Sequence, residues 1–163
     1  MGLFGSRRPG PAVEVAEGER LLASAALTDG RAVGGTRLAL YAPVADRWER
    51  IPWEHVRDGS WDGEDEALVV TVAGGYAHRL PLVDPALFLQ LFRERVTNSV
   101  VLVRHTPIAG RRGVRVVVRR RGDGTLVVTD ELDRGLDPAA PDVVAAVAAA
   151  RAELAAEVGL TAS

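Results

Sequence analysis

The feature that most constrains the fold is a change of hydrophobic period close to Asp84. From Glu19 to Val83, short segments of alternating apolar and polar residues are separated by turn residues, at the spacing typical of a β-meander. After Asp84, apolar residues recur every three to four positions, which is the period of an amphipathic helix. This change of period predicts a β-rich α+β fold in which a helix packs on an antiparallel sheet.

The segments before Asp84 predict five or six strands. We expect strands at 21–27, 36–41, 48–56, 67–73 and 76–83, with 58–61 as an extension of the third. Pro52 interrupts the third of these and argues for an edge strand or a bulge, because proline cannot donate to the ladder. Gly74-Gly75 predicts a tight hairpin between the last two, since both glycines accept a positive φ at little cost.

Residues 84–96 predict a helix of about 13 residues, opened by a capping carboxylate and a proline in Asp84-Pro85. Its expected apolar side consists of Leu87, Phe88, Leu91, Phe92 and Val96. Three more strands are expected at 99–104, 114–119 and 125–129, followed by an Ala-rich helix at 141–158 that Gly159 ends. The stripe of that helix is narrow and consists of Val143, Val147, Ala150, Leu154 and Val158.

Composition divides the chain into three expected parts: a flexible leader at 1–17, a domain at 18–97, and an extension at 98–163. The extension is expected to pack on the same domain, either by continuing its sheet or as a small appended subdomain. Leu3 and Phe4 beside Arg7 and Arg8 in the leader predict at most a weak contact with an anionic membrane.

The longest run without a charged residue, 67–78, is far shorter than the roughly 20 apolar residues that cross a bilayer. A cytoplasmic protein is therefore expected.

Five short motifs carry a resemblance to one family. They are Glu19-Arg20-Leu21-Leu22, Asp29-Gly30, Gly35-Thr36-Arg37-Leu38, Trp48-Glu49-Arg50-Ile51-Pro52-Trp53, and residues 80–85 leading into the helix. Over about residues 17–96 the chain resembles the bacterial pleckstrin-homology-like (PH-like or GRAM-like) domains, and is especially similar to a group of actinobacterial proteins of that kind. The resemblance implies a strongly bent sheet or partly open barrel with a helix at one end. It also implies binding of phospholipids, peptides or partner proteins.

A phosphoinositide site is not carried over from that family. The corresponding region holds three arginines, Arg20, Arg31 and Arg37, among acidic residues that nearly cancel them: Glu17, Glu19 and Asp29.

Charge is distributed unevenly along the chain although its formal total is only −2. All 20 basic residues are arginine, and segments 1–103, 104–121 and 122–163 carry −3, +7 and −6. The arginines of the middle segment predict a candidate polyanion or nucleic-acid contact at Arg111, Arg112, Arg115, Arg119, Arg120 and Arg121, with Arg104 in the same block. The alternative, which we favour, is that they face solvent and pair with the acidic residues Asp130, Glu131, Asp133 and Glu157.

Three tryptophans within 14 residues form the main aromatic concentration. We expect Trp53 to fill the core, and Trp48 and Trp61 to be candidates for an exposed interaction surface.

No catalytic, cofactor or metal site is predicted. The chain has no cysteine, its three histidines are dispersed at His55, His78 and His105, and no nucleophile or phosphate-loop motif occurs. The leading hypothesis is a non-enzymatic interaction or scaffold module with a protein partner, membrane-proximal through its leader. The alternatives are a polyanion binder using 104–121 and a carrier of a lipid or small molecule. The oligomeric state is left open.

Overall fold

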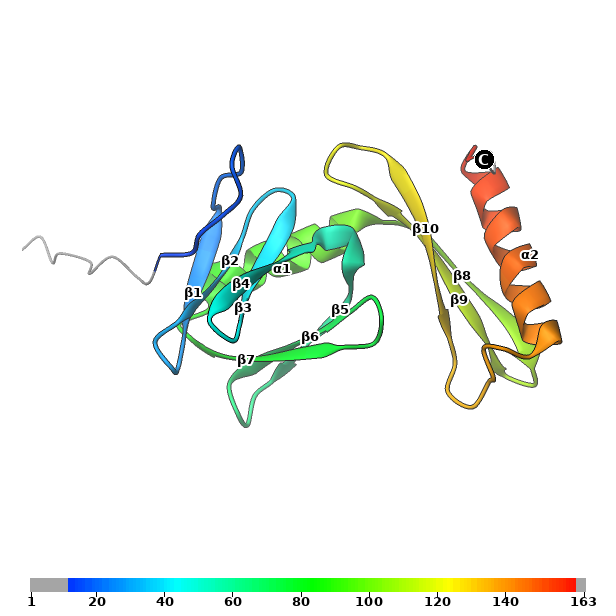
Figure 1. Ribbon diagram of the computed structural model, residues 1–163, viewed down its shortest axis with the longest axis horizontal. Helices are drawn as coiled ribbons and strands as arrows, with labels where there is room; N and C mark the ends of the chain where they lie inside the picture. Colours follow the sequence, from blue (N-terminus) through cyan, green and yellow to red (C-terminus); the bar gives the residue numbers. More distant parts are fainter. Residues whose placement is uncertain (1–11, 161–163) are drawn as a thin grey trace, which may run out of the picture. The chain divides into compact units, whose positions relative to one another are not determined.

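The computed structural model describes residues 12–160 and has a β-rich α+β fold. It divides into two compact units between Val96 and Thr97. The first contains a curled, seven-stranded antiparallel sheet with most of helix α1 (Ala86–Ser99), and the second contains a three-stranded sheet and helix α2 (Pro141–Glu157) (Figure 1). No helix within residues 12–160 is both long and apolar enough to cross a membrane. The predicted membrane contact of the leader lies in residues 3–8, outside the described residues.

The strands of the first unit are β1 (Ala23–Leu27), β2 (Ala32–Gly35), β3 (Ala39–Val44), β4 (Arg47–Pro52), β5 (Val56–Asp62), β6 (Ala67–Val72) and β7 (Ala77–Val83). They form two antiparallel meanders, β1 to β4 and β5 to β7, which the pairing of β1 with β7 joins into one sheet. Their order across the sheet is β4-β3-β2-β1-β7-β6-β5. The predicted hairpin between β6 and β7 is confirmed, with φ of 91° at Gly74 and 87° at Gly75. Pro52 is also on an edge strand, as predicted, because β4 ends the sheet.

The single strand expected at 48–56, extended by 58–61, is wrong. The chain leaves β4 after Pro52, makes one turn of 3-10 helix (η1, Trp53–His55), and starts β5 at the opposite edge of the sheet. The indole Nε1 of Trp53 donates to the carbonyl of Thr36 (3.0 Å), which holds the side chain in the core and bends the backbone at this point. Strand β2 was not expected, because its four residues are all buried and show no alternation.

Residues 13–16, which belong to the leader expected at 1–17, are packed against strands of the first unit. Val13 is buried in a small cluster with Ala32, Ala39 and Tyr41. The backbone N–H of Ala16 donates to the hydroxyl of Tyr41 (3.0 Å). The segment is irregular and is held by Val13, Val15 and the hydrogen bond of Ala16, so it carries no hydrophobic period that a sequence pattern could reveal.

The core of the first unit lies between the concave side of the sheet and α1. Phe88 and Phe92 of α1 are buried, and Phe92 meets Trp53 edge to face with ring centroids 5.9 Å apart. A β-carbon at Gly35 would lie 2.7 Å from Cδ2 of Leu91, so glycine at this strand position lets the helix approach the sheet. Leu87 was expected on the buried side of the helix but is 73% exposed.

The second unit is a three-stranded sheet with a helix on one face. Its strands are β8 (Val100–Ala109), β9 (Arg112–Arg120) and β10 (Leu126–Leu132), in the order β10-β9-β8. Val114, Val116 and Val118 of β9 are fully buried with Ala150 and Leu154 of α2. The predicted apolar stripe of the last helix is confirmed, because Val147 and Val158 pack against this cluster and Val143 is buried.

Candidate functional site

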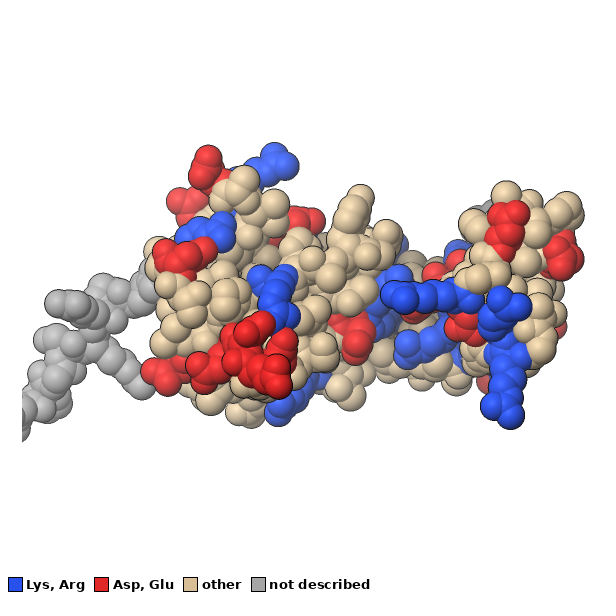
Figure 2. Space-filling model, turned by 90° about the horizontal axis from the view of Figure 1, so that it is seen from below, with Lys and Arg blue, Asp and Glu red and all other residues tan. Residues whose placement is uncertain are grey.

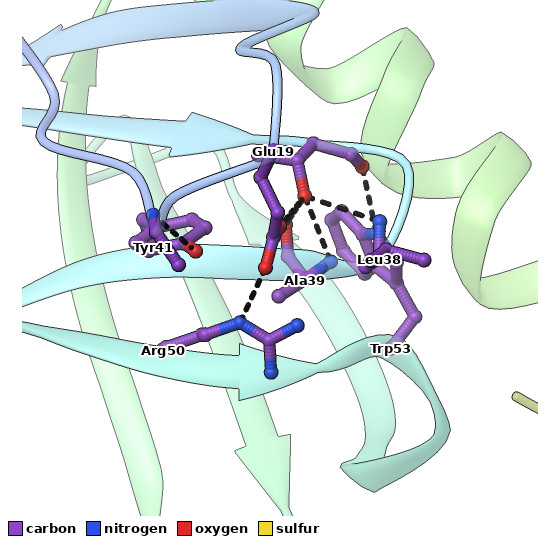
Figure 3. Close-up of polar contacts among 8 residues, drawn as sticks. Glu19, Leu38, Ala39, Tyr41, Arg50 and Trp53 are labelled. Atoms are coloured by element: carbon purple, nitrogen blue, oxygen red, sulfur yellow. Dashed lines mark hydrogen bonds and ion pairs between the residues drawn. The ribbon is translucent and has the colours of Figure 1, made fainter. Parts of the chain in front are cut away.

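A buried carboxylate, Glu19, lies four residues before β1 and is part of a network that holds the turn between β2 and β3. Its side chain is only 6% exposed, and its Oε1 accepts a hydrogen bond from Nε of Arg50 (2.6 Å). The hydroxyl of Thr36 donates to Oε2 of Glu19 and accepts hydrogen bonds from the N–H groups of Leu38 (3.1 Å) and Ala39 (3.0 Å). In Figure 3 the Glu19 carboxylate lies between Arg50 of β4 and the backbone of the turn between β2 and β3.

The charge of Glu19 is stabilised within this network. Burial raises the pKa of a carboxyl group, but the hydrogen bonds from Thr36, Arg50 and Tyr41 and the positive charge of Arg50 outweigh it, so the pKa of Glu19 lies below its ordinary value. Glu19 is therefore ionised at neutral pH and already has a cationic partner.

A cleft of about 350 Å³ opens beside this network. The residues that line it, which we call the Arg20–Arg37 cleft, are Gly18, Glu19, Arg20, Leu22, Thr36, Arg37 and Leu38. Arg20 and Arg37 are exposed, and no ion pair joins either of them to an acidic side chain within residues 12–160. The third arginine of this region, Arg31, is paired with Asp29 (2.7 Å).

A second hollow, of about 540 Å³, lies between β1 and α1. The residues that line it, which we call the β1–α1 groove, are Leu22, Ala23, Ser24, Leu87, Gln90, Leu91 and Glu94. Leu22 is 44% exposed and lines both hollows, so the cleft and the groove follow one another along the same segment of chain. Leu87 and Leu22 give the groove an apolar surface in contact with solvent, and Gln90 donates to the Glu94 carboxylate at its polar side (3.0 Å).

The backbone of β1 is only partly paired on the side of this groove. Strand β7 pairs with β1 at Ala26 and Leu27 alone, while β2 pairs with it from Ala23 to Ala26. The N–H of Thr28 donates to the carbonyl of Pro81 (3.1 Å), and alternation along a strand directs the backbone groups of Ser24 to that same side. Ser24 is exposed and lies beyond the last residue that β7 covers, so its N–H and C=O face the groove.

The predicted polyanion contacts are spread along β9 and the turns at its two ends. Arg111 and Arg112 lie at one end of β9, Arg120 and Arg121 at the other, and Arg115 in the middle. Arg111, Arg115, Arg120 and Arg121 are exposed, and Figure 2 shows basic side chains projecting from the second unit. Arg119 is only 3% exposed, and its Nη1 donates to the hydroxyl of Ser99 (2.8 Å). Burial removes Arg119 from the surface on which the prediction placed it.

The arginines of 104–121 pair with the acidic C-terminal segment only in part as expected. Arg104 forms an ion pair with Glu157 of α2 (2.5 Å). Asp133 instead pairs with His105 (2.9 Å) and accepts the N–H of Gly113 (2.8 Å), and Asp130 pairs with Arg151 of α2. Arg112 donates to the carbonyl of Gly135 (3.3 Å). Helix α2 thus contributes one acidic partner, Glu157, and one basic partner, Arg151.

The three tryptophans lie on different elements: Trp48 on β4, Trp53 in η1 and Trp61 on β5. Trp53 is in the core, as predicted. Trp48 of β4 is half-buried against Tyr41 and Val13, and it lines a shallow hollow of about 520 Å³ together with Arg47 and Arg50. Trp61 of β5 is exposed and lines none of the three hollows described.

Within residues 12–160, no three His, Cys, Asp or Glu side chains are placed to hold a metal ion. His105 and Asp133 are paired, and His78 lies 3.6 Å from the Glu49 carboxylate on a neighbouring part of the first unit.

Comparison of the chain with protein-family models, with curated proteins and with solved structures finds no match in any of the three. The candidate site therefore stands on geometry alone.

Sequence reasoning missed the residues that make the two hollows. The helical period places Leu87 in the apolar stripe of its helix, and no pattern in the sequence marks Leu22 or Ser24 as lining a groove. In the sequence, nearby acidic residues nearly cancel the charge of Arg20 and Arg37. In the structure two of these acids pair with other residues, Glu19 with Arg50 and Asp29 with Arg31.

Proposed function

We propose that this chain is a non-enzymatic, cytoplasmic interaction module with a PH-like first unit, and that the β1–α1 groove binds an extended segment of a partner protein. The PH-like part of the proposal is supported by the resemblance of residues 17–96 and by a curled seven-stranded sheet packed on a helix.

The observation that carries the proposal is the uncovered backbone of Ser24 next to two exposed leucines. An extended peptide can add to a sheet where backbone N–H and C=O groups are unpaired, with its side chains entering pockets on the adjacent surface. Here the Ser24 groups supply the hydrogen bonds, and Leu22, Leu87 and Leu91 supply the apolar contact. Burying an exposed leucine on binding contributes about 1.5–3 kcal/mol before the costs of association.

The partner expected from this chemistry is a short extended segment with an apolar side chain for the space between Leu22 and Leu87. The test is a selection of displayed random peptides on the full chain, followed by affinity measurement of the selected peptides on variants. Leu87→Asp places a charge in the groove at a side chain that is 73% exposed, so the fold is expected to tolerate it. The matched control is Tyr76→Asp, at a 71% exposed residue of the turn between β6 and β7.

We expect Leu87→Asp to weaken peptide binding at least tenfold and Tyr76→Asp to leave it unchanged. Selected peptides that bind Leu87→Asp as well as the parent protein, or a selection that yields none, would overturn the proposal. Binding that survives Leu87→Asp but disappears on raising the salt would point to the arginines of 104–121 instead.

A further inference from the structure

The two edges of the sheet in the second unit differ in how they are protected. The strand order is β10-β9-β8, so β10 and β8 are its edge strands. At the β10 edge, Nη2 of Arg151 in α2 donates to the carbonyl of Val128 (3.2 Å), and the same guanidinium group pairs with Asp130. A side chain thus occupies a backbone acceptor to which another strand would bind, and this protects the β10 edge against further pairing.

The outer edge of β8 is formed by the backbone of Val103 and His105. The N–H of Asp133 donates to the carbonyl of Gly113 (2.9 Å), so Gly113 and every second residue of β9 after it direct their backbone groups to β10. The residues between them face β8, where their partners are Leu102, Arg104 and Thr106. The N–H and C=O groups of Val103 and His105 therefore point away from β9, to the outside of the sheet.

The side chains at the β8 edge are apolar or paired within the chain. Val103 is 42% exposed and lies on the face of the sheet opposite to α2, since the preceding residue packs in the cluster that α2 covers. The two basic residues of β8 each contact a carboxylate, Arg104 that of Glu157 (2.5 Å) and His105 that of Asp133 (2.9 Å). These pairs leave the β8 edge without the excess positive charge that would keep two identical edges apart.

We infer that the outer edge of β8 pairs antiparallel with β8 of a second copy of this chain, which joins the two three-stranded sheets into one continuous sheet. A two-fold axis relates the identical strands, so the groups that Val103 and His105 present meet the same groups of the second copy. The assembly closes at two copies, because the edges left outermost are the β10 edges that Arg151 occupies. The dimer carries two β1–α1 grooves, and the inference does not depend on whether they bind a peptide.

The register of the two strands follows from the residues that face one another. If Val103 lies opposite His105 of the second copy, the two Arg104 side chains meet directly, and like charges opposite each other destabilise a sheet. If His105 lies opposite itself, Val103 faces Pro107, which has no N–H to donate. If Val103 lies opposite itself, Arg104 faces Leu102 and neither conflict arises. Val103 is therefore expected on the two-fold axis.

The test is sedimentation equilibrium of the full chain at roughly 1–100 µM, because a small interface of this kind is expected to have about micromolar affinity. The variants are Val103→Lys and Val103→Glu, each measured alone and both together as an equal mixture. Val144→Lys is the matched control, since Val144 is an exposed valine of α2 (52%) and is not part of β8. Far-UV circular dichroism and thermal unfolding check that each variant keeps the fold.

We expect the parent protein to dimerise and each Val103 variant alone to dimerise at least tenfold more weakly, because two like charges then meet at the axis. The equal mixture should dimerise within about threefold of the parent, since a positive charge faces a negative one. Val144→Lys should behave as the parent. A parent protein that stays monomeric over this range, a dimer that tolerates both single variants, or a mixture that stays monomeric would overturn the inference.

Cross-linking tests the same contact without a charged substitution. The chain has no cysteine, so Val103→Cys introduces a single thiol. Directly opposite residues of a hydrogen-bonded antiparallel pair have Cα atoms about 5.5 Å apart, a separation that a disulfide spans. We expect mild oxidation to link Val103→Cys into covalent dimers at least tenfold faster than Val144→Cys. Equal rates for the two variants would contradict a two-fold axis at Val103 and overturn the inference.

Discussion

Gly59 and Phe92 are packed so closely that a β-carbon on Gly59 would lie 2.2 Å from Cε1 of the Phe92 ring. Gly59 is in the middle of β5, and Phe92 is a buried residue of α1 that also contacts Trp53. The absence of a side chain at residue 59 therefore decides how closely the helix approaches the edge of the curled sheet that β5 forms.

Gly59→Ala is expected to destabilise the first unit by about 1–3 kcal/mol, since Phe92 must leave its position to make room for the methyl group. Chemical denaturation followed by far-UV circular dichroism measures the change. Gly63→Ala is the control: a β-carbon there meets no atom within 4 Å, and its effect should stay within about 0.5 kcal/mol. Equal effects of the two substitutions would contradict the packing described.

The Glu19 network predicts a dependence of stability on pH. Because the pKa of Glu19 is lowered in the folded protein, its contribution is present in full above the ordinary value of 4.5 and is lost as the pH falls through the lowered value. The difference in unfolding free energy between the parent and Glu19→Gln should therefore be largest near pH 7 and shrink between about pH 5 and pH 3. Urea titrations at several pH values measure it.

Glu17→Gln serves as the control for this experiment, because Glu17 is exposed and lies two residues away. Its effect should be small and nearly constant with pH. A difference for Glu19→Gln that grows as the pH falls would show that the carboxylate is not stabilised as the network implies.

Arg119 and Arg120 are adjacent in β9 but differ in their surroundings. Arg119 is buried and bonded to Ser99, whereas Arg120 is exposed. Arg119→Met should lower the free energy of unfolding by about 1–3 kcal/mol, because hydrogen bonds are lost and their buried polar partners are left without them. Arg120→Met should change the free energy of unfolding by no more than about 0.5 kcal/mol. Thermal unfolding of the two variants decides the point, and a larger loss for Arg120→Met would be inconsistent with the burial of Arg119.

The contact between α2 and its sheet is tested at Leu154. This side chain is fully buried among Val114, Val116 and Val118, so Leu154→Ala should lower the free energy of unfolding by about 2–5 kcal/mol. Val144, which is 52% exposed on the same helix, provides the comparison, and Val144→Ala should change stability by less than about 0.5 kcal/mol. Similar losses at the two positions would mean that α2 does not pack by the stripe described.

The parts of the fold that follow from neighbouring residues could be predicted from the sequence. The hairpin at Gly74-Gly75 depends on two positive φ angles, and the last helix on an apolar stripe closed by Gly159, so each signal is local. The separation of β4 from β5 could not, because the turn at Trp53 is held by a hydrogen bond to Thr36, 17 residues away. The same holds for Gly59, whose role appears only when α1 lies beside β5.

The sequence by itself determined the change from strands to a helix near Asp84, the hairpin at Gly74-Gly75, the last helix, and the uneven distribution of charge among the segments. Tertiary structure alone decided which charged side chains are held by an ionic partner or by burial and which remain exposed. Glu19 is taken by Arg50 and Asp29 by Arg31, which leaves Arg20 and Arg37 exposed, and Arg119 is withdrawn from the basic hairpin by burial. The physical reason is the separation along the chain of the groups involved. A turn or a helical stripe is specified within a few residues, whereas an ion pair or a buried side chain depends on groups that only folding brings together.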